Sequence, residues 1–128
     1  MGLREEISKI PALKNVGLAL VDYAESLSPG ISFELKGKRW VPSINFVTFT
    51  VQHAQAKNIV LSLRGNPTEF LKFPELQLRP GMGYGAYSEC TLSTPNQLAA
   101  VAMCIKKAHE ISRQGKTRTK KNPKIAES

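Results

Sequence analysis

Hydrophobic residues recur with two different periods along this chain, and the change of period most constrains its fold. Near both ends, apolar residues return every three or four positions, as on one face of an α-helix. Between residues 31 and 92 they mostly alternate with polar residues, which is typical of half-buried β-strands. Helical segments therefore flank a block of strands. This segregation predicts an α+β fold, in which helices cover an antiparallel sheet.

The two helical segments have recognisable ends. The first is expected to stop at residues 28–30, because the Ser-Pro-Gly sequence there breaks helices. Ser93 or Thr94 is expected to cap the second, with Pro95 in its first turn and Gly115 at its end. The apolar stripe of the first comprises Leu13, Val16, Leu20, Tyr23 and Leu27, and that of the second Leu98, Val101, Ala102, Ile105, Ala108 and Ile111.

The alternating block predicts an antiparallel sheet of about four to five strands, because the connections between the runs are short. In one of them, Ile59, Leu61 and Leu63 are expected to face inward. We expect the N-terminal and C-terminal helices to pack on one face of this sheet. The predicted strands are Ile31–Lys36, a return strand beginning at Arg39, Asn45–Gln52, Asn58–Arg64 and Ala86–Leu92.

Three glycines occupy alternate positions in the segment 81–85. A phosphate-binding loop opens directly into a helix, so that backbone amides and the helix dipole meet the anion. Here the glycines precede a strand, and we interpret them as a turn that allows positive φ or a close backbone approach. The neighbouring Arg79, Tyr84 and Tyr87 keep a ligand-binding or protein-binding site at this turn as an alternative.

The sequence contains no recognised catalytic or metal-binding arrangement. His53 falls in a predicted loop and His109 late in the last helix, where a cation would suit the helix dipole, and no cluster has zinc spacing. The tripeptide 34–36, Glu-Leu-Lys, fits part of a nuclease motif, but the only aspartate, Asp22, lies in the first helix. We therefore expect no metal and no cofactor, and do not expect an enzyme.

Cysteine usage and the chain's first residues indicate the compartment. Cys90 and Cys104 both have apolar neighbours, which predicts buried thiols in a reducing environment. Glu5 and Glu6 near the start, without an apolar run, do not fit a signal peptide. The longest apolar stretch, residues 16–21, is too short to span a bilayer. We expect a cytoplasmic protein that does not insert into membranes.

The net charge of +8 is concentrated at the C-terminus. Residues 106–128 contain eight lysines and arginines against two glutamates. We expect residues 1–112 to form a single domain, and residues 113–128 to form a basic tail that is disordered alone because it has few apolar residues. Such a tail attracts phosphate backbones without sequence preference. Its cations are Arg113, Lys116, Arg118, Lys120, Lys121 and Lys124.

A second basic group lies near the tight turn at residues 36–38. Lys36, Lys38 and Arg39 precede Trp40, and an exposed aromatic beside cations stacks on nucleic-acid bases. The alternative is that the aromatic residues fill the core, as alternation with polar residues indicates. We include all four residues in the predicted nucleic-acid contact surface.

The order of several segments resembles a small bacterial domain family. The segments are NFVTFTVQ, AKNIVLSLRG, GMGYGAYSECTL and STPNQLAAVAMCIKKAHE, so that the resemblance covers about Phe33 to Glu110. Members are often labelled "predicted transport protein" and are often appended to restriction-endonuclease-like and other defence proteins. The resemblance implies an accessory module, and it supplies no catalytic residues.

These observations predict a non-enzymatic accessory module with weak, sequence-nonspecific nucleic-acid binding through the basic tail. DNA or RNA backbone is the expected partner. The alternative is a protein-interaction or small-ligand-sensing domain with its site near Gly81–Gly85.

Overall fold

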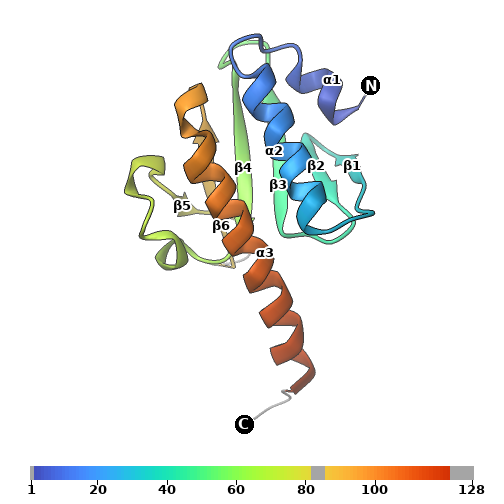
Figure 1. Cartoon of the computed structure of the whole chain (residues 1–128), viewed down its shortest axis with the longest axis vertical. Helices are drawn as coiled ribbons and strands as arrows, with labels where there is room; N and C mark the ends of the chain where they lie inside the picture. The colour runs from blue at the N-terminus through green and yellow to red at the C-terminus, as the bar shows by residue number, and fades with distance from the viewer. Residues whose placement is uncertain (1, 82–85, 122–128) are drawn as a thin grey trace.

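The protein has an α+β fold built on a six-stranded antiparallel sheet (Figure 1). The computed structural model describes residues 2–81 and 86–121, the last seven of these as backbone only. The strand order across the sheet is β1-β2-β3-β4-β6-β5. The strands are β1 (Phe33–Lys36), β2 (Arg39–Pro42), β3 (Val47–Gln52), β4 (Asn58–Arg64), β5 (Arg79–Pro80) and β6 (Tyr87–Leu92).

The sheet has more strands than the four to five that the sequence predicts. The additional strand is β5, which has only two residues and ends at Pro80. Two residues are too few to show alternation, and proline is normally confined to edge or terminal positions of a sheet. β5 indeed lies at the sheet edge, where it pairs with β6.

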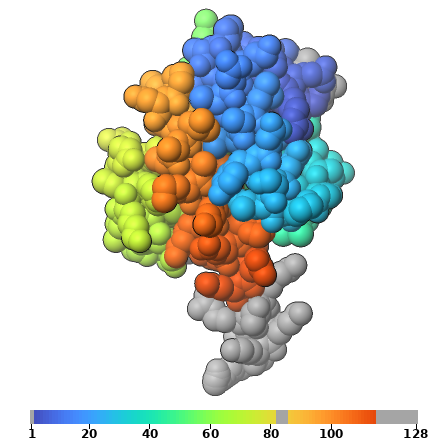
Figure 2. Space-filling model, in the orientation of Figure 1, coloured from blue at the N-terminus to red at the C-terminus, as the bar shows by residue number. Residues whose placement is uncertain are grey.

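The helices are α1 (Leu3–Ile7), α2 (Lys14–Leu27) and α3 (Leu98–Lys121), with short 3-10 turns at Pro67–Phe70 (η1), Pro74–Leu76 (η2) and Pro95–Gln97 (η3). In Figure 1, α2 and α3 run side by side in front of the sheet. Figure 2 shows that these two helices occupy the middle of the surface on this side, with the segment containing η1 and η2 beside α3. We call the sheet face beneath the helices the inner face and the opposite one the outer face.

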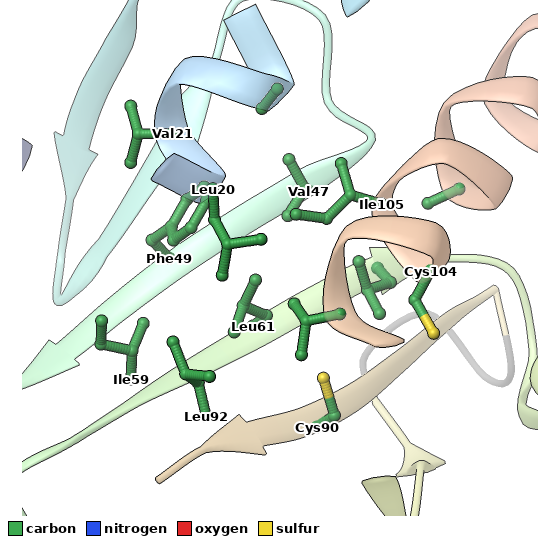
Figure 3. Close-up of a cluster of buried hydrophobic side chains, with 14 of the residues drawn as sticks. Leu20, Val21, Val47, Phe49, Ile59, Leu61, Cys90, Leu92, Cys104 and Ile105 are labelled. Carbon is green, nitrogen blue, oxygen red and sulfur yellow. The ribbon is translucent and has the colours of Figure 1, made fainter. Parts of the chain in front are cut away.

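Apolar residues at alternate positions of the central strands build the core on the inner face. Ile59, Leu61 and Leu63 of β4 are all fully buried, as predicted. Figure 3 shows these strands meeting α2 through Leu20 and α3 through Ile105. Fully buried aliphatic side chains each contribute roughly 1.5–3 kcal/mol through removal from water.

A glycine lets α2 approach both α1 and the sheet. A Cβ atom at Gly17 would lie 2.6 Å from Cγ2 of Ile7 and 3.1 Å from Cδ1 of Ile59. A side chain larger than hydrogen can occupy this space only if the side chains of Ile7 and Ile59 shift. The short α1 is thereby held against α2, where Leu3 and Ile7 complete the core.

The last helix is longer than predicted. α3 continues through Gly115 to Lys121, so the predicted helix end at Gly115 is wrong. A glycine inside a helix costs only about 1 kcal/mol relative to alanine, and it ends a helix where the chain turns left-handed. The surrounding arginine, glutamine and lysine residues are good helix formers. Residues 113–121 of the predicted disordered tail are thus helical, and residues 122–128 lie outside the described residues.

Replacing Leu61 by alanine tests the inner core. Leu61 is fully buried, so L61A is expected to lower the free energy of unfolding by about 2–5 kcal/mol. Leu71, which is 75% exposed, provides the control, and L71A is expected to stay within about 0.5 kcal/mol of the parent. Urea unfolding followed by circular dichroism measures both. Equal losses in the two variants would contradict this assignment of the core.

Candidate functional site

The outer face of the sheet is polar where the inner face is apolar. The strand register places Thr48, Ser62 and Glu89 in one row across β3, β4 and β6. Alternation along each strand sends these side chains away from the helices. The hydroxyl oxygen of Thr48 is buried and has no hydrogen-bond partner among the described residues. This row of the outer face therefore consists of polar side chains, of which Thr48 and Ser62 are themselves buried.

Basic side chains border an open hollow on this face. Its volume is about 590 Å³. Four of its lining residues are cationic, and Glu89 is the one acidic residue among them. The complete lining consists of Lys36, Gly37, Lys38, Arg39, Thr50, Gln52, Val60, Arg79 and Glu89. We call Lys36, Lys38, Arg39 and Arg79 the basic rim.

The basic rim unites residues from two predicted sites. Lys36, Lys38 and Arg39 belong to the predicted nucleic-acid surface, and Arg79 belongs to the alternative site near the glycine turn. The first three come from the β1–β2 hairpin, and Arg79 comes from β5 at the opposite edge of the sheet. They line the same hollow although the strand order separates them.

Arg79 is oriented by two neighbours on β6. Its Nη2 lies 3.6 Å from Oε1 of Glu89 and donates to Oγ1 of Thr91 at 3.2 Å. The guanidinium side chain remains 47% exposed. An exposed ion pair adds little stability, but these contacts hold the guanidinium at the edge of the hollow. A held guanidinium loses less rotamer freedom when it binds an anion.

A second arginine lies further along the outer face. Nη1 of Arg64 donates to the hydroxyl oxygen of Tyr87 at 3.3 Å, and its guanidinium carbon lies 5.4 Å from the centre of the Tyr87 ring. Arg64 and Tyr87 are directly opposite each other on β4 and β6. Tyr87 is thus brought to the same face as Arg79, while Tyr84 lies outside the described residues.

Trp40 does not belong to the exposed surface, which corrects the prediction that it stacks on bases. The register pairs it with Phe49, and both side chains are buried on the inner face. The indole Nε1 donates to Oε1 of Glu6 at 3.1 Å. Because side chains alternate along β2, Arg39 faces outward while its neighbour Trp40 faces the core.

The glycine segment connects two paired strands. β5 and β6 run antiparallel, with Arg79 opposite Glu89, so the chain reverses direction between them. The backbone amide of Gly81 donates to the carbonyl oxygen of Tyr87 at 2.8 Å. The interpretation of this segment as a turn stays a prediction. Gly83 and Gly85 lie outside the described residues.

The histidines are separate from the basic rim. The ring of His109 packs edge-on against Phe46, with the ring centres 4.9 Å apart. Burial, and secondarily the charge of Arg113, lowers the pKa of His109. The helix continues well beyond His109, so its predicted place near a helix C-terminus is wrong. His53 is half-buried after β3, and the described residues contain no group of three potential metal ligands.

Both cysteines are buried between α3 and β6, as predicted, and neither forms a disulfide (Figure 3). Burial raises the pKa of Cys90 to about 12 and that of Cys104 to about 12. A thiol nucleophile reacts as its thiolate, and desolvation disfavours that form. The two thiols therefore act as small core side chains.

The described residues include all of the predicted C-terminal cations except Lys124. Arg113 is exposed on α3. The last turns of α3 extend past the end of the sheet in Figure 1. The helix backbone carries Lys116, Arg118, Lys120 and Lys121, whereas Lys124 lies outside the described residues.

Sequence reasoning missed Arg64, Glu89 and Thr91 as parts of the outer face. Each alternates with a buried neighbour in its own strand, and this pattern shows that it faces away from the core. The pattern does not show which strands lie side by side. The pairing of β6 with both β4 and β5 brings these residues next to Arg79 and Tyr87.

Comparisons with protein-family models, curated proteins and solved structures found no significant match to this chain. The resemblance to the bacterial domain family stays a prediction. In the portion of the chain that the structure describes, no helix has both the length and the apolar character needed to cross a membrane.

The cysteine environment predicts slow thiol labelling of the folded protein. At pH 8, a thiol with a pKa of about 12 is ionised in roughly one molecule in ten thousand, against about a quarter of molecules for an unperturbed cysteine. We expect Ellman's reagent to label neither cysteine rapidly in buffer and both in denaturant. Glutathione under the same conditions is the control. Rapid labelling of either cysteine in the folded protein would contradict its buried placement.

Proposed function

We propose that this protein is an accessory module that binds nucleic acid weakly and without sequence preference through the phosphate backbone. The observation that carries the proposal is the convergence of the four cations of the basic rim on one hollow of the outer face. A single acid, Glu89, lines the same hollow, and it already contacts Arg79. The local surface therefore has an excess of positive charge.

Clustered cations bind nucleic acid because phosphate contacts release condensed counterions. Lysine ammonium and arginine guanidinium groups donate charge-assisted hydrogen bonds to phosphate oxygens. Such contacts position a nucleic acid but carry no direct sequence information. The buried position of Trp40 removes the predicted base-stacking contact, which favours binding through phosphates. The basic residues of α3 and of the following segment add further charge to the proposal.

A second candidate function is recognition of a small anion or an acidic protein segment beside Arg79 and Tyr87. The observation in its favour is that Arg79 is held by Glu89 and Thr91 while half of its side chain stays exposed. A small anion makes few ionic contacts, so its affinity falls less steeply with salt than that of an extended polyanion. Salt dependence therefore separates the two candidates.

Neutralising the basic rim tests the proposal. The triple variant Lys38→Gln, Arg39→Gln and Arg79→Gln should bind labelled DNA and RNA more weakly at low salt. Each lost phosphate contact is expected to reduce the slope of log K against log salt by about 0.7–0.9. Fluorescence anisotropy over a series of salt concentrations measures both quantities. A truncated chain that ends at Ser112 shows how much of the affinity and of the salt slope depends on the C-terminal cations.

A matched variant separates location from net charge. The control replaces three exposed lysines outside the basic rim, Lys9, Lys14 and Lys72, by glutamine, and so removes the same charge. It should keep most of the salt slope of the parent. Equal losses in the two triple variants would show that net charge alone attracts the nucleic acid. The absence of binding by the parent at low salt would refute the proposed function.

A further inference from the structure

The β1 strand forms one edge of the sheet and presents an exposed apolar side chain. It is the first strand in the sheet order and pairs on one side only, with β2. Leu35 at its centre is 50% exposed, and both neighbours, Glu34 and Lys36, are exposed as well. In Figure 1, β1 lies at the outer margin of the sheet. An edge strand is a template onto which another strand can pair.

The β1–β2 hairpin fixes which backbone groups are available at this edge. Lys36 and Arg39 flank a two-residue turn in which Gly37 has a φ of +66°, as glycine has at the first central position of a type II′ turn. The two residues that flank such a turn form a hydrogen-bonded pair. Further along the same ladder, the amide of Ser43 donates to the carbonyl oxygen of Ser32 at 3.0 Å.

Along an antiparallel edge strand, the backbone groups of every second residue bond to the neighbouring strand, and those of the residues in between point away from it. Residues 32, 34 and 36 direct their backbone groups toward β2. The N–H and C=O of Leu35 consequently point outward from the sheet. An added strand would find its hydrogen-bonding partners at Leu35.

The side chains of β1 favour Leu35 as the centre of a symmetric contact between two copies of the chain. A second copy of β1, placed antiparallel about Leu35, puts Glu34 of each copy opposite Lys36 of the other. Opposite charges facing each other across strands are stabilising, and like charges are destabilising. The two Leu35 side chains meet on the inner side of the joined sheet, which removes exposed apolar surface from water. Among the registers that the outward backbone groups allow, the charge pattern thus selects the one centred on Leu35.

We propose that two copies of this chain associate through antiparallel pairing of their β1 strands, centred on Leu35. The contact has two-fold symmetry, because each strand presents the same groups to the other. Leu35 exchanges both backbone hydrogen bonds with Leu35 of the second copy, and two Glu34–Lys36 ion pairs flank it. The joined sheet places two outer faces in one continuous surface. The proposal does not depend on nucleic-acid binding.

Other arrangements satisfy fewer of these constraints. A pairing centred on Glu34 could use the outward backbone groups of Phe33 and Leu35, but it would place the two glutamates directly opposite each other. A pairing centred on Phe33 would leave Glu34 and Lys36 without opposite charges. The edge at β5 has only two residues, and Pro80 has no N–H to donate. β1 is accordingly the edge that a second copy fits.

Charge exchange within β1 tests the register. Sedimentation equilibrium from micromolar to millimolar concentrations should show a monomer–dimer equilibrium for the parent chain. Glu34→Lys alone or Lys36→Glu alone creates two like-charge contacts, and each should raise the dimer dissociation constant about tenfold. The double variant E34K/K36E restores both pairs and should restore the parent dissociation constant. Lys14→Glu, on the exposed side of α2, should leave it unchanged.

Leu35→Pro tests the backbone contact independently. The amide of Leu35 does not bond to β2 in this pattern, and edge strands tolerate proline where no ladder bond is lost. L35P should therefore keep the circular dichroism spectrum and a cooperative unfolding transition while abolishing the dimer. A parent chain that is monomeric at every concentration would overturn the proposal. A dimer that survives both L35P and the single charge variants would overturn it as well.

Discussion

The packing of α2 and α3 against one face of β3, β4 and β6 is the interaction on which the rest of the structure depends. It buries Leu61, Leu92 and their neighbours, and it decides which half of each alternating strand points to the outer face. Successive side chains of a strand point to opposite faces of the sheet. Once these apolar residues face the helices, the residues between them must point to the opposite face. Thr48, Ser62 and Glu89 must occupy the outer face. The polar surface is thus a consequence of the hydrophobic core.

The alternation of side chains between the two faces also gathers positive charge on the outer face. Each strand contributes outward residues, but only the fold places the hairpin cations Lys38 and Arg39 around the same hollow as Arg79 from β5. Trp40 shows the strength of the effect, since the preceding Arg39 lies at the basic rim while the ring of Trp40 is buried in the core. The indole N–H is satisfied by Glu6 from α1, so the polar atom of this ring is not left unpaired in the interior. The proposed function belongs to the outer face, and the buried core that stabilises the fold lies on the inner face.

The sequence predicts the α+β class, the main strands and their inward residues, because hydrophobic periodicity records local burial directly. It does not predict β5, whose two residues are too short to show a period. It also misplaces the end of α3, since glycine at position 115 disfavours a helix only weakly. The outer-face neighbours of Arg79 could not be predicted, because their proximity depends on strand order. For Trp40, the flanking charges suggested exposure, whereas alternation with Arg39 and Val41 agrees with its burial.

An amide chemical-shift titration with a short oligonucleotide of mixed sequence tests most directly whether the outer face binds phosphate backbones. Binding at the basic rim predicts shifts that cluster at Lys38, Arg39 and Thr50 in the hairpin region and at Arg79 and Thr91 near β5. Amides of α2, such as that of Leu20, should move little. Shifts confined to the helix side, or an unchanged spectrum at low salt, would contradict binding at the outer face.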